Sequence, residues 1–134
     1  MSMESINVKS VKRNELIDIN HEVEDIVAKS GIKEGICNIY APHATCGIII
    51  NENYDPNVCL DIIDLLKEYV PQGKWRHDRI DDNADAHIKA AIVGPSETIP
   101  ISEGRLVMGR WQSIMLADFD GPRERKIVVT IIKS

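Results

Sequence analysis

The spacing of apolar residues along the chain predicts a series of short strands. Apolar and polar residues alternate over two early segments, and short apolar stretches bounded by turn residues follow; these segments are 5–11, 15–19, 35–41, 45–51, 98–101, 106–108, 111–119 and 126–132. Alternation of this kind is typical of a half-buried strand. The run Ile48-Ile49-Ile50 indicates a strand covered on both faces. Because short turns such as Asp120-Gly121-Pro122 connect the last strands, we expect a mainly antiparallel sheet.

Three further segments, 20–30, 56–70 and 84–93, have the apolar spacing of helices. Their boundaries carry residues typical of helix ends, namely Asn20, Asp55-Pro56 and Asn83 at the starts and Gly31, Pro71 and Gly94 at the stops. The chain has 134 residues, which is the size of one domain. We therefore predict a single α+β domain over residues 1–134, with a mainly antiparallel twisted sheet and about three helices.

The segment from His77 to His87 is the most informative part of the chain. It contains two histidines, four aspartates and one asparagine within eleven residues. A solvated loop does not need the histidines, and a core segment disfavours the carboxylates. Imidazoles and carboxylates together form metal sites and acid–base sites. We therefore favour a functional role for this segment over the alternative of satisfied, half-buried histidines.

Composition excludes several classes of protein. The net charge is −5 and the pI about 5.3, which argues against nucleic acid as the main partner. No apolar run is long enough to cross a membrane, so we expect a cytoplasmic protein. The three cysteines match no zinc motif and are expected to be buried, reduced thiols. Motifs of P-loop, dinucleotide-binding, nucleophile-elbow and zincin proteins are absent.

Polar residues at predicted turns and strand ends are further candidates. His43 lies between two predicted strands, and Glu52 follows an apolar strand, where it is either a general base or part of a solvated turn. Asn83 and His87 are four residues apart, so they share one side of a helix start. Arg123 lies at the turn after Asp118 and can hold a phosphate, although a surface ion pair is the alternative.

The combination of these motifs is more specific than any one of them. His43-Ala-Thr-Cys-Gly47, Asn51-Glu52, the segment from His77 to Ala90, Gly109-Arg110-Trp111-Gln112 and Phe119-Asp120-Gly121-Pro122-Arg123 occur in this order. In this combination the chain resembles the YjbQ family, also called UPF0047, over nearly its whole length. Two positions depart from the family pattern: Ala44 replaces a usual threonine, and Arg110 replaces a usual small residue.

The resemblance implies a compact α+β fold, a homotrimer and a weak thiamine phosphate synthase activity. That reaction joins hydroxymethylpyrimidine diphosphate to a thiazole phosphate and releases pyrophosphate. The family's polar positions that carry over as catalytic candidates are His43, Glu52, Asn83 and His87. Those that carry over as candidates for binding the phosphorylated substrate are Asn51, Gln112, Asp120 and Arg123.

Two alternatives for the metal and two for the function stay open. Asp78, Asp81, Asp82 and Glu52 are potential oxygen ligands for Mg²⁺, whereas His43, His77 and His87 are potential ligands for Zn²⁺. The first functional hypothesis is a transferase that acts on phosphorylated heterocycles. The second is a protein that binds a metal or a small ligand and whose catalysis is incidental.

Overall fold

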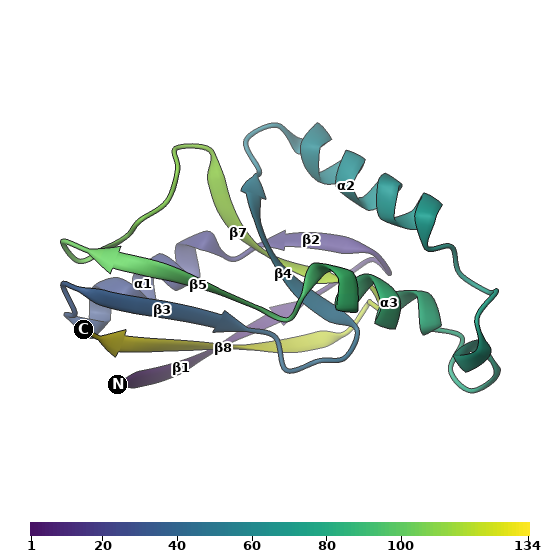
Figure 1. Ribbon diagram of the computed structural model, residues 1–134, viewed down its shortest axis with the longest axis horizontal. Coiled ribbons are helices and arrows are strands. Elements are labelled where there is room, and N and C mark those ends of the chain that lie inside the picture. The colour runs from purple at the N-terminus through teal and green to yellow at the C-terminus, as the bar shows by residue number, and fades with distance from the viewer.

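The computed structural model describes residues 1–134, folded as two antiparallel sheets and three α-helices (Figure 1). The five-stranded sheet has the order β1 (Ser2–Lys9), β8 (Glu124–Lys133), β3 (Gly35–Tyr40), β5 (Ser96–Ser102) and β6 (Arg105–Leu106). The three-stranded sheet has the order β2 (Glu15–Asp18), β7 (Gln112–Asp118) and β4 (Cys46–Glu52). The predicted α+β class and antiparallel pairing are therefore confirmed.

The main core lies between α1 (Asn20–Ser30) and the inward faces of both sheets. Val23 and Val27 supply the helix face, and alternate residues of the strands supply the rest. β7 is covered on both faces, since every residue from Ile114 to Asp118 is buried. The run Ile48-Ile49-Ile50 was expected to be covered on both faces, but Ile49 and Ile50 are only half-buried. Both faces of β4 are therefore covered only in part, because Ile50 packs against the main core and Ile49 against the cluster of Ala86 and Phe119.

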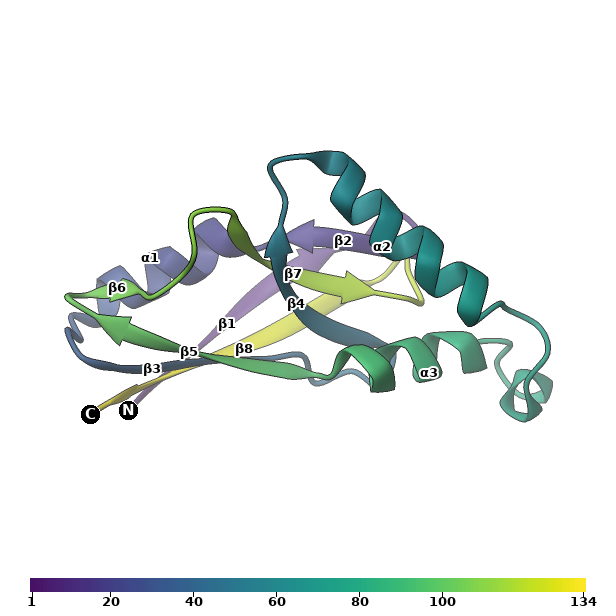
Figure 2. The ribbon, with the colours of Figure 1, turned by 45° about the horizontal axis from the view of Figure 1, so that its top comes forward.

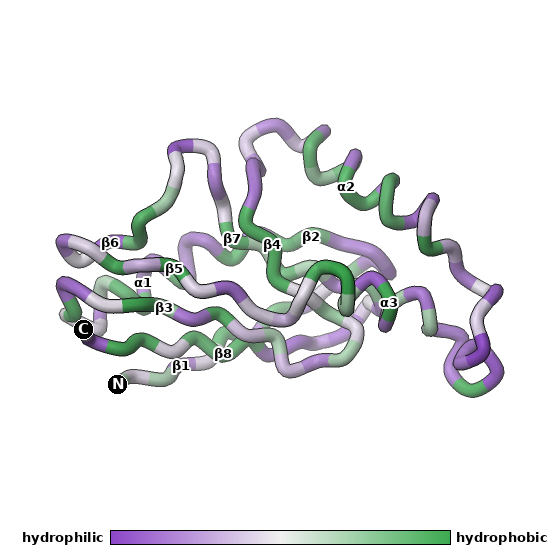
Figure 3. The backbone as a smooth tube through the Cα atoms, in the orientation of Figure 1, coloured by the Kyte–Doolittle hydropathy of each residue, from purple (hydrophilic) through white to green (hydrophobic).

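Helix α2 (Pro56–Tyr69) stands away from the body of the molecule (Figure 2). Asp55 caps it as predicted, accepting a hydrogen bond of 2.9 Å from the Asn57 N–H. None of its residues is buried, although apolar residues recur along it (Figure 3). Leu65 and Tyr69 are more than half exposed, at 53% and 72%. One side of the helix is half-buried, with Leu66 packed against the cluster of Ala86 and Phe119, but the apolar residues that stay exposed are typical of a surface that meets another molecule.

Helix α3 (Ala84–Val93) packs closely against β4 and β7. Ala86 and Ala90 contact Ala117 and Phe119 of the β7 segment, so small side chains allow the close approach. Gly47 contributes to the same approach, because a Cβ there would lie 2.6 Å from Val93 Cγ1 and 2.8 Å from the Gly94 carbonyl oxygen. A short 3₁₀ helix, η1 (Arg76–Arg79), precedes α3 and was not predicted. No helix is long and apolar enough to cross a membrane.

Two helix starts differ from the prediction. Asn20 is the first residue of α1 and does not cap it; its backbone N–H instead donates to Asp18 Oδ1 at 2.8 Å. Asn83 occupies the cap position of α3 but its side chain makes no capping bond. Asp78 takes over that function by accepting from the Ala84 N–H at 3.0 Å. The side chain of Asn83 is thereby available for a different contact.

Candidate functional site

Asp78 builds the turn that brings η1 against the start of α3. Its two carboxylate oxygens accept from the Trp75 N–H at 2.9 Å and from the Ala84 N–H at 3.0 Å. These backbone hydrogen bonds, that from Trp75 first, lower the pKa of the Asp78 carboxyl below its usual value. Asp78 is therefore a structural anchor of this segment, with both oxygens already occupied.

The anchored segment borders an open pocket of about 580 Å³ that is lined by residues of η1 and α3. His77 and His87 contact each other at its wall, with ring centroids 4.9 Å apart and the rings nearly perpendicular. The residues that line the pocket include four basic or potentially basic side chains and one aromatic ring; the full set is Lys74, Trp75, Arg76, His77, Ala84, His87 and Ile88. No carboxylate is among them. We call this cavity the histidine pocket.

The two histidines have few protein partners. His77 Nε2 is buried without a hydrogen bond, and its nearest carboxylate oxygen, Oδ2 of Asp81, lies 3.8 Å away. Trp75 is fixed beside them because its indole Nε1 donates to the Pro71 carbonyl at 2.7 Å, and Lys74 Nζ lies 5.0 Å from its ring centroid. The pocket thus combines two imidazoles, a fixed indole and the cationic side chains of Lys74 and Arg76.

Asp120 links the start of α3 to the turn before β8. Its Oδ2 accepts from Asn83 Nδ2 at 2.8 Å and from Arg123 Nη2 at 3.2 Å. Arg13 approaches the other oxygen, with Nη1 3.7 Å from Asp120 Oδ1. The structure therefore brings together Asn83, Asp120 and Arg123, three of the positions that the resemblance gave as candidates, and adds Arg13, which no sequence motif marked.

A buried ion pair lies directly behind this group. Arg125 donates to both oxygens of Asp118, at 2.9 and 2.8 Å, and Ser10 donates to the same carboxylate at 2.7 Å. Burial acts to raise the pKa of Asp118, but the hydrogen bonds from Arg125, the Asp120 N–H and Ser10 outweigh it and hold the pKa below its usual value. Asp118 is fully buried, so this pair is a structural support.

His43 does not join the histidine pocket. Its Nε2 lies 3.0 Å from the Lys126 backbone nitrogen, which donates to it, and 3.1 Å from the Lys126 carbonyl oxygen. The ring therefore holds the turn before β4 against β8. The neighbouring Thr45 accepts from Arg125 at 3.0 Å, which joins the same turn to the buried ion pair.

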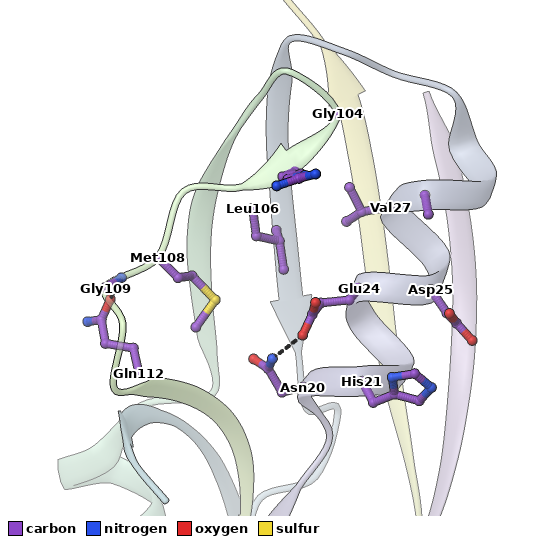
Figure 4. Close-up of a pocket in the computed structure, with 12 residues that line it drawn as sticks. Asn20, His21, Glu24, Asp25, Val27, Gly104, Leu106, Met108, Gly109 and Gln112 are labelled. Carbon is purple, nitrogen blue, oxygen red and sulfur yellow. Dashed lines mark hydrogen bonds between the residues drawn. The ribbon is translucent and has the colours of Figure 1, made fainter. Parts of the chain in front are cut away.

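Asn51, Glu52 and Gln112 lie at the far end of the three-stranded sheet. Cys46 pairs with Asp118 at one end of the β4–β7 ladder, and Glu52 pairs with Gln112 at the other. At about 3.3 Å per residue the two ends are about 20 Å apart. Gln112 lines a second cavity of about 530 Å³ between α1 and the segment from Gly104 to Gly109 (Figure 4). Its Oε1 accepts from the Gly109 N–H at 2.8 Å.

The expected metal sites are not assembled in the chain. No group of three or more His, Cys, Asp or Glu side chains is arranged to hold a metal ion. The three-histidine site is not formed because His43 is bonded to β8, whereas His77 and His87 lie together beside α3. The proposed carboxylate ligands of Mg²⁺ are also dispersed, since Asp78 binds backbone N–H groups and Glu52 lies at the other end of β4.

Sequence reasoning also missed a buried ion pair between two residues of α3. Lys89 and Asp85 are almost fully buried and form an ion pair of 2.9 Å. The signal that could have found them is their spacing of four residues, which pairs side chains on a helix. The three cysteines are free as expected; Cys37 and Cys46 are buried, and Cys59 is half-buried.

Comparison with known proteins agrees with this fold and with the motifs. A family model described as "UPF0047 protein YjbQ-like" matches residues 4–134. The UPF0047 protein MJ1081 of Methanocaldococcus jannaschii is 46% identical over 125 residues, covering 93% of this chain and 90% of the relative. The UPF0047 protein YugU of Bacillus subtilis is 39% identical over 133 residues, covering 97% and 98%.

Solved structures show the same architecture. A YbjQ-like protein of unknown function from Sulfolobus solfataricus superposes with a TM-score of 0.96 at 44% identity, over 99% of this chain and 97% of the other. The hypothetical protein APE1520 of Aeropyrum pernix gives a TM-score of 0.96 at 35% identity, with both chains fully covered. The chain therefore belongs to the YjbQ-like UPF0047 family.

Proposed function

We propose that the histidine pocket binds a phosphorylated heterocycle and that the chain has a weak transferase activity of the thiamine phosphate synthase type. The observation that carries the proposal is the lining of the pocket: Lys74, Arg76 and two imidazoles surround the Trp75 indole, with no carboxylate among them. Cationic side chains and N–H donors suit phosphate groups, and an indole face suits a planar ring.

The proposed reaction needs little acid–base chemistry. The ring nitrogen of the thiazole phosphate attacks the methylene carbon of hydroxymethylpyrimidine diphosphate, so that a C–N bond forms. The C–O bond to the diphosphate breaks, and pyrophosphate leaves with the electron pair. The attacking nitrogen carries no proton, so no base is required. We expect His77 and His87, which lie together in the pocket, to donate hydrogen bonds or a proton to the departing oxygen.

The residues of the pocket do not fit a resident metal ion. Its lining has no carboxylate, and no group of three potential ligands is assembled. We therefore derive no step through a protein-bound metal. Mg²⁺ commonly binds to substrate phosphates while keeping several waters, so any Mg²⁺ would enter as part of the diphosphate substrate.

One observation favours the second candidate function, a binding protein with incidental catalysis. His43, Glu52 and Gln112 do not reach the histidine pocket within one chain. The pocket alone provides groups that bind an anion, but it lacks the further polar residues that the family resemblance implied. Because this set of residues is incomplete for catalysis, it supports ligand binding without efficient turnover.

The experiment that tests both candidates compares product formation and ligand affinity in four proteins. Wild type, His77→Ala, His87→Ala and the control His21→Ala are supplied with both substrates and Mg²⁺, and affinity for thiamine phosphate is measured by calorimetry. Transferase function predicts at least about a tenfold loss of rate in the two pocket variants, with the control unchanged. A binding function predicts loss of affinity with marginal turnover throughout. Unchanged affinity and rate in both pocket variants would refute the site.

We also propose a cytoplasmic homotrimer. The exposed apolar residues of α2 support assembly, because a large uncovered apolar face favours contact with other chains. Tyr54 and Trp111 add an exposed aromatic pair at the end of the sheet, with ring centroids 5.2 Å apart. Three free cysteines fit the reducing conditions of the cytoplasm.

A further inference from the structure

The Asp85–Lys89 pair belongs to α3, the helix that carries His87, and lies on its buried side. The exposed fractions of the two side chains are 1% and 2%, and Lys89 Nζ lies 2.9 Å from Asp85 Oδ2. Lys89 also donates to Asn14 Oδ1 at 3.1 Å. Neither side chain lines the histidine pocket. The pair therefore has no direct contact with a ligand in that pocket.

Arg13 completes the group from the turn between β1 and β2. Its Nη2 donates to Asp85 Oδ1 at 3.0 Å and to the Asp82 carbonyl at 3.2 Å. Both oxygens of Asp85 are thus occupied by cations, one from its own helix and one from a distant turn. The Asp85–Arg13 and Lys89–Asn14 bonds therefore connect α3 to the turn between β1 and β2 at two positions one helical turn apart.

A buried ion pair of this kind is a poor source of stability. The free energy needed to remove two charges from water offsets most of the free energy gained from their attraction. Apolar side chains of similar volume often replace such a pair without loss of stability. Conformational specificity is a better-supported reason to keep such a pair, as a hypothesis for each protein. Such specificity is useful here because α3 contacts Ala117 and Phe119 through the short side chains of Ala86 and Ala90. Alanine side chains do not interlock, so we expect the rotation of α3 between its two anchored ends, at Asn83 and Val93, to depend on polar contacts along the helix.

The rotation of α3 determines where His87 lies. Successive helical residues turn by about 100°, so Asp85 and Lys89 share one side of the helix while Ala84, His87 and Ile88 share another. The second side lines the histidine pocket. A small rotation of α3 would therefore carry His87 away from His77, which it now approaches at 4.9 Å between ring centroids.

We propose that Arg13, Asp85 and Lys89 form an ionic clamp that fixes the rotation of α3 and so positions His87 against His77. The three are positioning residues, since they act through His87. The importance of this geometry for ligand binding rests on the proposed function. The clamp itself is a statement about the ligand-free protein and is open to an independent test.

The test removes both buried charges at once. Asp85→Leu/Lys89→Met replaces the pair with apolar side chains of similar volume, and Asp25→Leu/Lys29→Met makes the same change at an exposed pair with the same spacing on α1. Circular dichroism establishes folding, and NMR measures the cross-relaxation between the ring protons of His77 and His87 without ligand. We expect that signal to fall at least fivefold in the folded α3 variant and to persist in the control.

The outcome is decisive even if the double variant does not fold. In that case Asp85→Asn, which keeps the size and an acceptor oxygen but loses the charge, is measured in the same way. Loss of the His77–His87 signal in whichever variant folds, with the control intact, supports the clamp. Persistence of the signal in that folded variant overturns it. If the signal is lost but affinity for thiamine phosphate is unchanged, the clamp stands and the proposed function fails.

Discussion

Asp118 and Arg125 are the residues whose charges matter most to folding. Both are buried, and two hydrogen bonds join them. Burial acts to lower the pKa of Arg125, but the hydrogen bond to Asp118 outweighs it, so the pKa of Arg125 is raised. Because the pKa of Asp118 is lowered in the folded protein, its stabilising contribution is fully present above the unfolded pKa of about 3.9. The contribution is lost as the pH falls through the lowered folded value.

Asp118→Asn should therefore destabilise the protein in a pH-dependent way. The variant leaves the Arg125 charge buried without its partner, which costs about 3–5 kcal/mol near pH 7. The difference in unfolding free energy from wild type should shrink below about pH 4, as wild-type Asp118 becomes protonated. Chemical denaturation between pH 7 and pH 3 measures it, with exposed Asp64→Asn as the control. A difference that stays constant with pH would contradict this account.

Also at the scale of single residues, the three cysteines should differ in reactivity. Burial raises the pKa of Cys37 to about 11 and, together with the charge of Asp118, that of Cys46 to about 12. The thiolate is the reactive form, so neither thiol should react in the folded protein at pH 8, whereas half-buried Cys59 should react first. Iodoacetamide labelling followed by peptide mass spectrometry measures the order. Labelling of Cys46 at its unfolded rate under native conditions would refute the prediction.

At the scale of elements, the contact between α3 and β4 depends on one glycine. A Cβ at position 47 would meet Val93 and the Gly94 backbone at less than 3 Å, so α3 must shift outward to admit it. Gly47→Ala should cost about 1–3 kcal/mol of stability. Gly109→Ala is the matched control, because its Cβ meets only the flexible end of Gln112. Denaturant unfolding compares the two, and equal stability of both variants would contradict the close-packing account.

The elements were largely predictable because their signals are local. Apolar alternation and the Asp55-Pro56 start depend on neighbouring residues, and the bounds of α3 were predicted to the residue. The caps at Asn20 and Asn83 were wrong because Asp18 and Asp78 supply acceptors from outside the helix. The length of the predicted strand at 106–108 was also wrong, since β6 ends at Leu106.

The site was less predictable because it depends on which strand ends meet. The cluster of His77, Asn83 and His87 follows from closeness in sequence. That Asp120 and Arg123 join Asn83, while Glu52 and Gln112 do not, follows from the register of β4 on β7. Arg13 has no local signal, because its partners are about 70 residues away along the chain.

At the scale of the whole molecule, α2 provides the test of assembly. Light scattering should give three times the chain mass of 15.0 kDa for the wild type. Leu65→Glu/Tyr69→Glu should reduce that mass, because charges on the exposed apolar face that the proposed trimer would bury disfavour association. Val11→Glu, at an exposed apolar residue in the turn before β2, should leave it unchanged. A wild-type mass equal to one chain would remove the trimer proposal.

The central claim concerns the histidine pocket, and the four histidines provide the most direct measurement of it. Their ring protons are followed by NMR while thiamine phosphate is added to the wild-type protein. The account predicts saturable shifts at His77 and His87, which line the pocket, and little change at His21 on α1 or at His43, which is bonded to Lys126. Saturable shifts confined to His21 or His43, or no shift at any histidine, would contradict it.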